Sequence, residues 1–557
     1  MLDRGALIAM MLAVSCCGKG GQQEPAPAPK PDEDTGTVMI SVVGTNDLHG
    51  HLEALPVLAG YLRNLRAARA RDGGAVLVLD AGDMFQGTLE SNPNEGAMVI
   101  RAYSALGYTA ATIGNHEFDF GPVGEAATAG PGEEPRGALE ARAAEAAFPL
   151  LMANIVETAS GEPPDWRNVE PSAIVEAAGV RVGLIGVTTM ATPYTTMAAN
   201  FAGLRMVPIA EAVARRAVAL RKDGAQAVIV VAHAGAACRD LEHPRRLESC
   251  DADAEIFEVA RALPRGAVDA IVAGHTHQAV AHIVNEVPII ESYAYGRAFG
   301  RLDLLVDRGT GAVRLSELHA PRDLCSARPP APCEPGPYEG AAVAPDPAIA
   351  AMIEPAFAAA RERKAALLGV VASKKIRRAG AEESALGNLF VDLMRQARPD
   401  ADVAITNGGG LRADLPEGPL TYGALYEAMP FDNRFARITM TGAELAQVVG
   451  NNLGRSRGIF SLGGVRATAR CKGKTLEVTL VRDSGAPVRD AEVLQVITSD
   501  FLASGGDGAF GGVGLAPGAI ELESGETIRD AMASALRTRG GALDPHALYD
   551  PKRPRLR

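Results

Sequence analysis

Short apolar runs, each ending in a cluster of polar residues, recur through the first half of the chain. Runs of this length that are rich in Val, Ile and Leu are typical of buried strands. We therefore expect a helix at 55–70 and strands at 38–45, 75–79, 108–113, 148–154, 180–187, 226–231, 268–273 and 301–306. Open α/β sheets carry their chemistry where such strands end. The pattern predicts an α/β fold with functional residues at the strand ends.

A Pro-rich passage at 321–347 separates this region from a second one. A helix is predicted at 349–368, with Pro355 as a candidate kink. Beyond it the α/β pattern starts again, with a helix at 384–395 and a strand at 402–406. A Pro-rich stretch followed by a helix is typical of a domain boundary. We expect a first domain at 38–324, a linker and hinge helix at 325–368, a second domain at 369–545 and a tail at 546–557.

The length and the charge of the chain narrow its class. A chain of 557 residues exceeds what one hydrophobic core supports, in agreement with two large domains. The formal net charge is −12, and the pI is near 5.5. Nucleic-acid polymers bind to basic surfaces, so this charge argues against such a partner. A small anionic substrate in a local site remains open.

The N-terminus predicts an export signal. The apolar run at 6–14 is too short to span a bilayer and ends in LAVSC, a segment that resembles a bacterial lipobox. In this interpretation residues 1–16 are a lipoprotein signal peptide whose Cys16 carries the lipid, and 17–37 is a flexible tether. A plain cleaved signal peptide and lipidation at Cys17 are the alternatives. We expect an exported protein, lipid-anchored in the cell envelope on the periplasmic side or in the outer membrane.

Five cysteines follow the predicted signal. Export permits disulfides, and close spacing favours the pairs Cys238–Cys250 and Cys325–Cys333. Cys471 is left over, and we expect it to be buried. No CxxC spacing occurs, so zinc binding by cysteine is not expected.

Five of the ten histidines lie at predicted strand ends, beside carboxylates and one amide. One such histidine would be an ordinary core residue, but five together indicate a shared role. Alternate residues of an extended segment face the same side and can hold one ion. Seven N and O donors suit two adjacent ions of Zn, Mn, Co or Fe that share a carboxylate. The candidate ligands are Asp47, His49, Asp83, Asn115, His233, His275 and His277.

The segment GNHEFDFG at 114–121 supplies a further imidazole and carboxylate, His116 and Asp119. It directly follows the strand predicted at 108–113, where an α/β sheet carries its chemistry. Read alone, the segment also fits a turn stabilised by Asn and Gly.

The second region offers features for binding a planar anion. The strand at 402–406 ends in NGGGLR, whose glycines allow close approach to the backbone and whose Arg412 can meet an anion with a planar fork. A turn is the alternative. Phe431 and Phe501 lie next to loop residues in a chain with only 4% aromatics. Two such rings could stack a planar base, although two core phenylalanines fit the residue types equally well.

The motifs NDLHGHLE, GDMFQG, GNHEFDFG, AHAG and GHTH, in this order, resemble those of the calcineurin-type metallophosphoesterases. They resemble more closely the bacterial 5′-nucleotidase/UDP-sugar hydrolase family, over almost the whole chain after the tether. The resemblance implies an N-terminal four-layer α/β/β/α domain, a linker helix and a C-terminal α/β substrate-binding domain. It also implies hydrolysis of 5′-nucleotides to nucleosides and phosphate by a water that two metal ions activate.

The resemblance also implies a role for each matching residue. One metal is held by Asp47, His49, Asp83 and His277, and the other by Asp83, Asn115, His233 and His275. The catalytic dyad is His116 and Asp119. The base lies between Phe431 and Phe501, and the other substrate contacts come from Asn407, Arg412, Asn433 and Asp507. Metals and base then lie on different domains, so the helix at 349–368 is expected to be a hinge that gates turnover.

One departure from the family concerns an arginine that relatives carry shortly before a Gly-Asn segment, aimed at the anionic end of the substrate. Here the nearest basic residues are Arg377 and Arg378, slightly upstream. Either the loop shifts Arg378 into place or the phosphate contact is weaker.

Several rival functions fit the same residues. Within enzymes, they are hydrolysis of UDP-sugars, of 2′,3′-cyclic nucleotides or of a sulfur ester. In a different class, the chain would be a non-catalytic surface lipoprotein that captures nucleotides.

Overall fold

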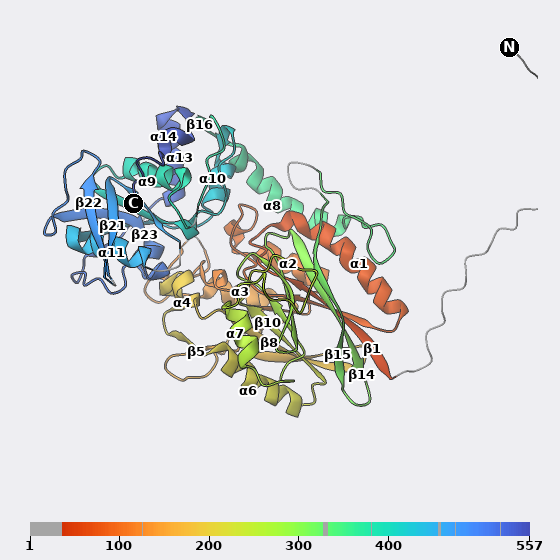
Figure 1. Cartoon of the computed structure of the whole chain (residues 1–557). Helices are drawn as coiled ribbons and strands as arrows, with labels where there is room; N and C mark the ends of the chain where they lie inside the picture. Colours follow the sequence, from red (N-terminus) through yellow and green to blue (C-terminus); the bar gives the residue numbers. More distant parts are fainter. Residues whose placement is uncertain are drawn as a thin grey trace, which may run out of the picture. The chain divides into compact units, whose positions relative to one another are not determined.

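Two β-sheets packed face to face form the centre of the first domain in this computed structural model (Figure 1). The structure describes residues 36–124, 126–326, 332–379, 381–454, 458–473, 475–523 and 525–557. The predicted signal peptide, Cys16 and the tether up to residue 35 lie outside the described residues. The first sheet has the order β15-β14-β1-β2-β3-β4-β6. Its strands are β1 (Thr37–Thr45), β2 (Ala75–Asp80), β3 (Ala110–Thr112), β4 (Leu150–Leu151), β6 (Val169–Glu170), β14 (Ala298–Asp307) and β15 (Val313–Asp323).

The second sheet has the order β12-β13-β11-β10-β8-β7. Its four central strands are parallel, as are β1 to β6 of the first sheet. The strands are β7 (Ser172–Ala177), β8 (Val180–Thr188), β10 (Ala227–His233), β11 (Ala270–Ala273), β12 (Ala279–Val284) and β13 (Val287–Ser292). A separate two-stranded sheet pairs β5 (Ile155–Glu157) with β9 (Leu204–Met206). Parallel strands bring their carboxyl ends to one edge, and here both sheets do so.

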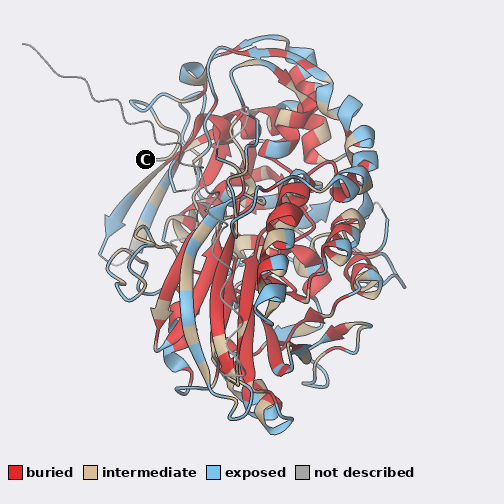
Figure 2. Cartoon of the chain, turned by 90° about the vertical axis from the view of Figure 1, so that its right-hand side faces the viewer, coloured by how far each residue is buried: buried red, intermediate tan, exposed pale blue. Residues whose placement is uncertain are grey.

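Helices cover the outer face of each sheet, so the domain has four layers, α/β/β/α. Val42, Leu184 and Ile229 belong to the apolar cluster between the two sheets. Helices α1 (Leu55–Arg71), α2 (Ala97–Leu106) and α3 (Gly137–Glu145) share a second cluster with the first sheet. Helices α6 (Ile209–Lys222) and α7 (Glu255–Ala262) share a third with the second sheet. Figure 2 shows the central strands buried along most of their length. The predicted fold class is confirmed.

The helix predicted at 349–368 is α8 (Pro347–Ala365). The side chain of Asp346 caps it by accepting two backbone N–H groups of the first turn. The helix continues through Pro355. The prediction is wrong at the C-terminal end, because Leu367–Ala372 forms strand β16, which pairs with β18 and β25. Tertiary pairing there overrides the helical pattern of the sequence.

The second domain contains a five-stranded sheet in the order β20-β17-β23-β19-β24 and a three-stranded sheet in the order β18-β16-β25. The strands are β17 (Val403–Asn407), β18 (Gly418–Thr421), β19 (Phe435–Thr441), β20 (Phe460–Gly463), β23 (Val493–Ser499), β24 (Ile520–Leu522) and β25 (Gly541–Leu543). The helices that pack on them are α9 (Ala385–Ala397), α10 (Tyr422–Ala428), α11 (Gly442–Leu453), α12 (Asp500–Ala503) and α13 (Ile528–Arg539). A hairpin joins β21 (Val465–Lys472) to β22 (Thr475–Arg482).

The last residues, expected as a tail, are packed against the second domain. They include α14 (Pro545–Leu548), whose Leu548 is buried. The guanidinium of Arg555 pairs with the carboxylate of Asp392 at 2.7 Å.

Both predicted disulfides, Cys238–Cys250 and Cys325–Cys333, are present. The prediction that Cys471 is buried is wrong, because this residue is exposed. It lies opposite Leu476 near the end of the two-stranded hairpin β21–β22. Leu476 and Arg470 beside it are not buried either, so the end of the hairpin stands in solvent.

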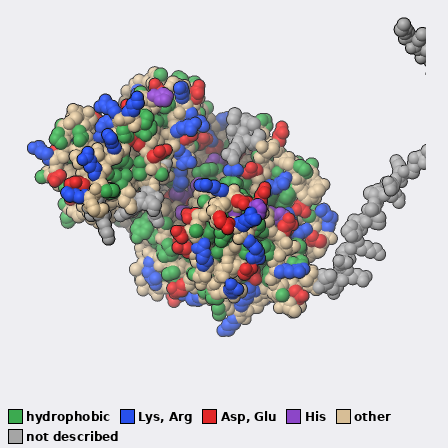
Figure 3. Space-filling view, in the orientation of Figure 1, with side chains coloured by type: hydrophobic (Ala, Val, Ile, Leu, Met, Phe, Trp, Pro, Cys, Tyr) green, Lys and Arg blue, Asp and Glu red, His purple; other side chains and the backbone are tan. Residues whose placement is uncertain are grey.

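Charges of both signs share the visible surface of the molecule. On the face visible in Figure 3, Lys and Arg side chains are interspersed with Asp and Glu. Among the described residues, no helix combines the length and the apolar character needed to cross a bilayer.

Candidate dimetal active site

The predicted metal ligands of both sheets converge at one edge. They lie in the last residues of β10 or in the loops that follow β1, β2, β3 and β11. The structure brings together all seven predicted donors, Asp47, His49, Asp83, Asn115, His233, His275 and His277.

The first group consists of Asp47, His49 and His277. The Nε2 atoms of the two imidazoles face each other at 3.0 Å. Asp47 Oδ1 lies 3.3 Å from His277 Nε2 and 3.9 Å from His49 Nε2. Three donor atoms that point at one spot are what a metal ion requires.

The second group consists of Asp83, His233 and His275, with Asn115 beside them. His233 Nε2 lies 3.1 Å from Asp83 Oδ2, 3.0 Å from Asn115 Oδ1 and 3.2 Å from His275 Nδ1. Asp83 Oδ2 is also 3.8 Å from His49 Nε2 in the first group. This oxygen therefore lies between the two groups, where a bridging carboxylate is needed.

Backbone carbonyls set the tautomer of two of these histidines. His49 Nδ1–H donates to the carbonyl of Gln86 at 2.8 Å, and His233 Nδ1–H donates to that of Ala81 at 2.7 Å. A carbonyl can only accept, so Nδ1 carries the proton and the Nε2 lone pair points into the cluster.

The donor set fits two divalent cations. Asp47 is fully buried, yet its Oδ1 has no hydrogen-bond partner among the described residues. Its Oδ2 accepts N–H groups from Asn46 and His275, each at 2.8 Å. A buried carboxylate oxygen with only imidazole nitrogens near it is costly, and a cation at the first group would compensate its charge. Mixed imidazole and carboxylate donors favour Zn, Mn, Co or Fe.

The charges of the cluster shift the pKa values of His233 and His275 in opposite directions. Burial lowers the pKa of His233, but the carboxylate of Asp83 outweighs this effect and raises it to about 10. Burial and the neighbouring His233 lower the pKa of His275 to about 3. A cation at the second group would take the place of the proton on His233, so metal binding should release a proton.

Several ligands have a left-handed backbone conformation, which sets the direction of their side chains. Left-handed φ values cost of order 1–3 kcal/mol for residues other than glycine, and five of the seven donors adopt them. The φ values are 51° at Asp47, 49° at His49, 56° at Asp83, 84° at His275 and 58° at His277.

Two buried glutamates fix the loops that carry these ligands. Glu117 accepts four backbone N–H groups, from residues 83, 84, 85 and 114, at 2.7–3.3 Å. Glu291 accepts the N–H of Ala236 at 2.9 Å and the hydroxyl of Thr276 at 2.6 Å. Close packing adds a constraint at Gly114, where a Cβ would lie 2.3 Å from Asp83 Oδ1.

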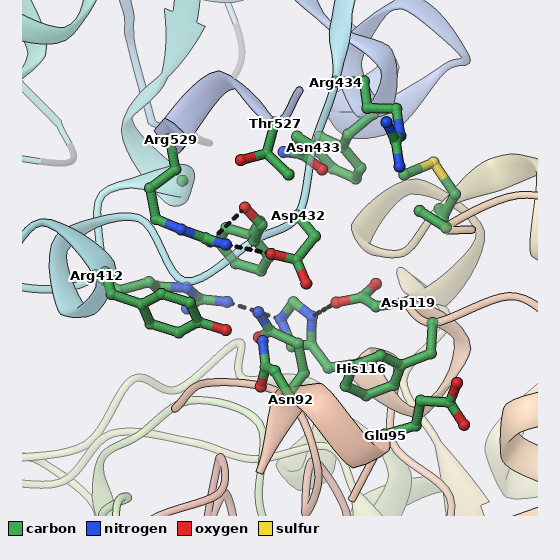
Figure 4. A pocket seen from close by; sticks show the side chains of 18 of the residues that line it. Asn92, Glu95, His116, Asp119, Arg412, Asp432, Asn433, Arg434, Thr527 and Arg529 are labelled. Carbon is green, nitrogen blue, oxygen red and sulfur yellow. Dashed lines mark hydrogen bonds and ion pairs between the residues drawn. The ribbon is translucent and has the colours of Figure 1, made fainter. Parts of the chain in front are cut away.

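His116 lies between Asp119 and Arg412, which approach its ring from opposite sides (Figure 4). Its Nδ1–H donates to Asp119 Oδ2 at 2.6 Å, and its Nε2 lies 2.7 Å from Arg412 Nη2. Burial lowers the pKa of His116, but Asp119 outweighs this effect and the pKa lies above its usual value. Because arginine can only donate, Nε2 accepts an N–H of Arg412 in this arrangement. If substrate took the place of Arg412, the raised pKa would let Nε2 hold a proton and give it to a leaving oxygen.

One cavity of about 620 Å³ joins this region to the second domain. Phe431 and Phe501 line it, and the ring of Phe501 lies on Gly506, where a Cβ would meet the ring at 2.5 Å. Of the predicted site residues, those that line the cavity are Asp83, Asn115, His116, Asp119, His275, His277, Asn407, Arg412, Phe431, Asn433, Phe501 and Asp507.

Arg378 is not among the residues that line the cavity. It is exposed, and its guanidinium donates to the carbonyl of Leu411 at 2.9 Å. It therefore lies beside the Arg412 segment without reaching the cavity.

Sequence reasoning missed several residues that line the cavity, namely Gln86, Asn92, Glu95, Arg363, Arg434 and Arg529. Arg529 is almost fully buried, donates to the carbonyl of Phe431 at 2.9 Å and pairs with Asp432 (Figure 4). It lies within a helix and carries no motif, so nothing local in the sequence distinguishes it.

Comparison with known families identifies both domains. Residues 40–279 match the calcineurin-like phosphoesterases, and residues 363–512 match the 5′-nucleotidase C-terminal domain. The chain therefore belongs to the calcineurin-like phosphoesterases that carry a 5′-nucleotidase C-terminal domain.

Known proteins are similar to this chain in sequence or in fold. The probable 5′-nucleotidase of Treponema pallidum is 28% identical over 86% of this chain and 88% of its own length. The cell wall protein Lmo0130 of Listeria monocytogenes is 26% identical over 85% of this chain, which spans only 64% of that protein. The 5′-nucleotidase precursor of Thermus thermophilus has a TM-score of 0.68 at 24% identity, covering 90% of this chain and 97% of its own. The sulfate thiohydrolase SoxB of the same organism has a TM-score of 0.67 at 16% identity, covering 93% and 96%.

Glu117→Gln should weaken the metal centre, because an amide NH₂ would face backbone N–H groups that now meet a carboxylate. Supporting groups behind metal ligands are worth about 10–100-fold in affinity or activity, and we expect a loss of that size. Metal content by atomic emission and phosphate release would measure it, with exposed Glu248→Gln as the control. Full metal content and turnover in Glu117→Gln would contradict this role.

Proposed function

We propose that the chain is a metal-dependent 5′-nucleotidase, which hydrolyses a nucleotide to a nucleoside and phosphate. One observation carries the proposal: a single cavity is lined by metal ligands, by His116 and by Phe431 and Phe501 of the other domain. Both domain matches and the Treponema relative support it.

In the proposed reaction, each group of residues in the cavity has a separate role. Two bound divalent ions would activate a water and polarise the phosphoryl oxygens. His116, oriented by Asp119, would stabilise charge on the phosphoryl group or protonate the leaving oxygen. Arg412, within hydrogen-bond distance of His116, would meet the phosphoryl group with its planar fork.

The second domain would hold the nucleoside. Phe431 and Phe501 would stack the base, because aromatic rings bind any base through its flat face. Asn407, Asn433 and Asp507 lie in the same cavity and would contact the polar atoms of the nucleoside. Asn407 Nδ2–H donates to Asp507 Oδ2 at 2.7 Å, which keeps these two side chains together.

We propose that the two domains separate for substrate exchange, with the end of α8 as the hinge. The contacts that would break include the burial of Leu89 in the apolar cluster of the second domain and several polar contacts. The carbonyl of Pro430, next to Phe431, accepts side-chain N–H groups of Gln86 at 2.8 Å and Asn92 at 3.0 Å. Lys364 at the end of α8 pairs with Glu90 at 3.0 Å. Such a set can form and break during turnover.

The rivals differ from this proposal in the use of the cavity. The fold alone does not choose a substrate, since SoxB shares it. A small sulfur ester would not need two aromatic rings beside the metal ligands. UDP-sugars and 2′,3′-cyclic nucleotides would use them, and a volume of about 620 Å³ leaves room for a sugar. A non-catalytic nucleotide binder would have no use for a full set of metal ligands and a His–Asp pair.

We propose further that the protein is exported and anchored by a lipid on Cys16. The lipobox-like segment before Cys16 supports this. Mass spectrometry of the mature N-terminus should find diacylglycerol on Cys16. The Cys16→Ala variant should no longer be found in the membrane fraction. An unmodified N-terminus at another residue would contradict the anchor.

The substrate assignment predicts selective damage from Phe431→Ala. Stacking is worth about 1–3 kcal/mol per base, so kcat/KM for AMP and UMP should fall by about 5–150-fold. Ribose 5-phosphate, which has no base, serves as the matched control and should be hydrolysed as before. If the enzyme prefers p-nitrophenyl phosphate or ribose 5-phosphate to AMP, the assignment of a base site to Phe431 and Phe501 is wrong. The assignment of the metal site would not be affected. Preference for UDP-glucose or 2′,3′-cyclic AMP would favour a rival.

His116→Ala should lower turnover by about 10²–10⁴-fold, the usual contribution of a positioned acid or base. Metal content should not change, because His116 belongs to neither ligand group. Exposed His243→Ala is the control. Near-normal turnover with both metals bound would show that His116 has another role.

A further inference from the structure

A third group of metal-binding side chains lies outside the active site. It consists of Cys238, Cys250 and His282, whose sulfur atoms and one ring nitrogen lie within 4.8 Å of one another. Cys238 and Cys250 face each other as an isolated antiparallel bridge and form a disulfide. His282 lies on β12, the strand whose Ala279 carbonyl accepts the N–H of Cys238 at 3.2 Å. The donors thus come from two segments that are already fixed to each other.

The environment of His282 is costly without a ligand. Its side chain is fully buried, and Nε2 makes no close hydrogen bond within the described residues. Its polar neighbours are the backbone of Arg246 and Asp240 and the N–H of Ala281, which lies 3.4 Å from Nδ1. A buried polar group left in this way costs about 1–3 kcal/mol. Burial lowers the pKa of His282, so the imidazole is neutral, which is the form that binds metals. The disulfide explains why the two sulfurs meet, but not why an imidazole is buried beside them.

We propose that Cys238, Cys250 and His282 form a redox-gated site for Zn²⁺ or a similar thiophilic cation, closed by the disulfide and opened by its reduction. A dithiol reductant supplies two electrons and two protons. The S–S bond breaks, two thiols form, and the reductant becomes a cyclic disulfide. On metal binding both thiols lose their protons to solvent, which leaves two thiolates, one neutral imidazole and a fourth position for water.

The geometry is close to what zinc needs. Zn–S bonds of about 2.3 Å and Zn–N bonds of about 2.0–2.1 Å place tetrahedral donors about 3.4–3.8 Å apart. Donors that already lie within 4.8 Å reach this spacing by side-chain rotation. Cys238 and Cys250 are both partly exposed, so a reductant and an ion can approach from solvent.

The chain contains its own control. Among the described residues, Cys325 and Cys333 belong to no comparable group of metal ligands. The two groups in the active site contain no sulfur, so their metals give no thiolate signal. A thiolate signal in a variant with only Cys238 and Cys250 beyond the signal peptide would therefore report this site alone.

The experiment uses the full-length chain after its tether with Cys325, Cys333 and Cys471 replaced by Ser. The protein is reduced with dithiothreitol, desalted without oxygen and titrated with Co²⁺. We expect thiolate-to-cobalt charge-transfer absorption whose amplitude corresponds to one sulfur-bound ion per chain, which disappears on addition of Zn²⁺ and is absent before reduction. His282→Gln should weaken Co²⁺ binding at this site by about tenfold or more.

Two outcomes would overturn the proposal. One is a reduced protein without charge-transfer absorption, and the other is equal Co²⁺ affinity in His282→Gln. Phosphate release by the oxidised His282→Gln variant, expected at the wild-type rate, checks that it folds. If it does not fold, Cys238→Ser, which retains His282, replaces it and should lose affinity in the same way.

Discussion

The structure depends on concentrating charge where water cannot reach it. Asp47 and Asp83, with exposed fractions of 0% and 1%, lie among four imidazoles at the meeting point of two sheets. Buried carboxylates of this kind are tolerated only when cations or hydrogen bonds compensate them. Asp47 Oδ1 makes no close hydrogen bond within the described part of the chain and has only imidazole nitrogens near it, at 3.3 Å and 3.9 Å, so this compensation is incomplete. Two divalent ions would complete it, so that metal binding and the stability of the strand-end loops are linked.

The metal ligands keep their positions only if the loops that carry them are fixed. Glu117 and Glu291 gather their N–H groups, and left-handed backbone at five ligands turns the side chains inward. The sheets supply the rigid base for this arrangement, because three apolar clusters separate their four layers. The active site then needs only the second domain, which brings Arg412 to His116 and the two aromatic rings to the same cavity.

Local pattern was enough to predict eight strands of the first domain and the seven candidate ligands at their ends, because buried parallel strands and the polar residues that follow them are encoded in adjacent positions. The four layers were implied by the family resemblance, and the sheet strands β7, β12, β13 and β15 were not predicted. Contacts between distant segments were not predictable in this way. The role of Arg529 depends on its ion pair with Asp432, which only the folded chain brings next to it. The role of Glu117 depends likewise on the four backbone N–H groups that surround it in the folded chain. The end of α8 and the exposure of Cys471 depend on strand pairing and on solvent around a hairpin, which the local sequence does not record.

If two ions share the strand-end cluster, anomalous diffraction from crystals soaked with Mn²⁺ will locate both of them. We expect two peaks about 3.5–4 Å apart. One should lie at Asp47, His49 and His277, and the other at Asp83, His233 and His275, with Asp83 Oδ2 between them. A single peak, or two peaks away from these residues, would show that the cluster does not hold two ions.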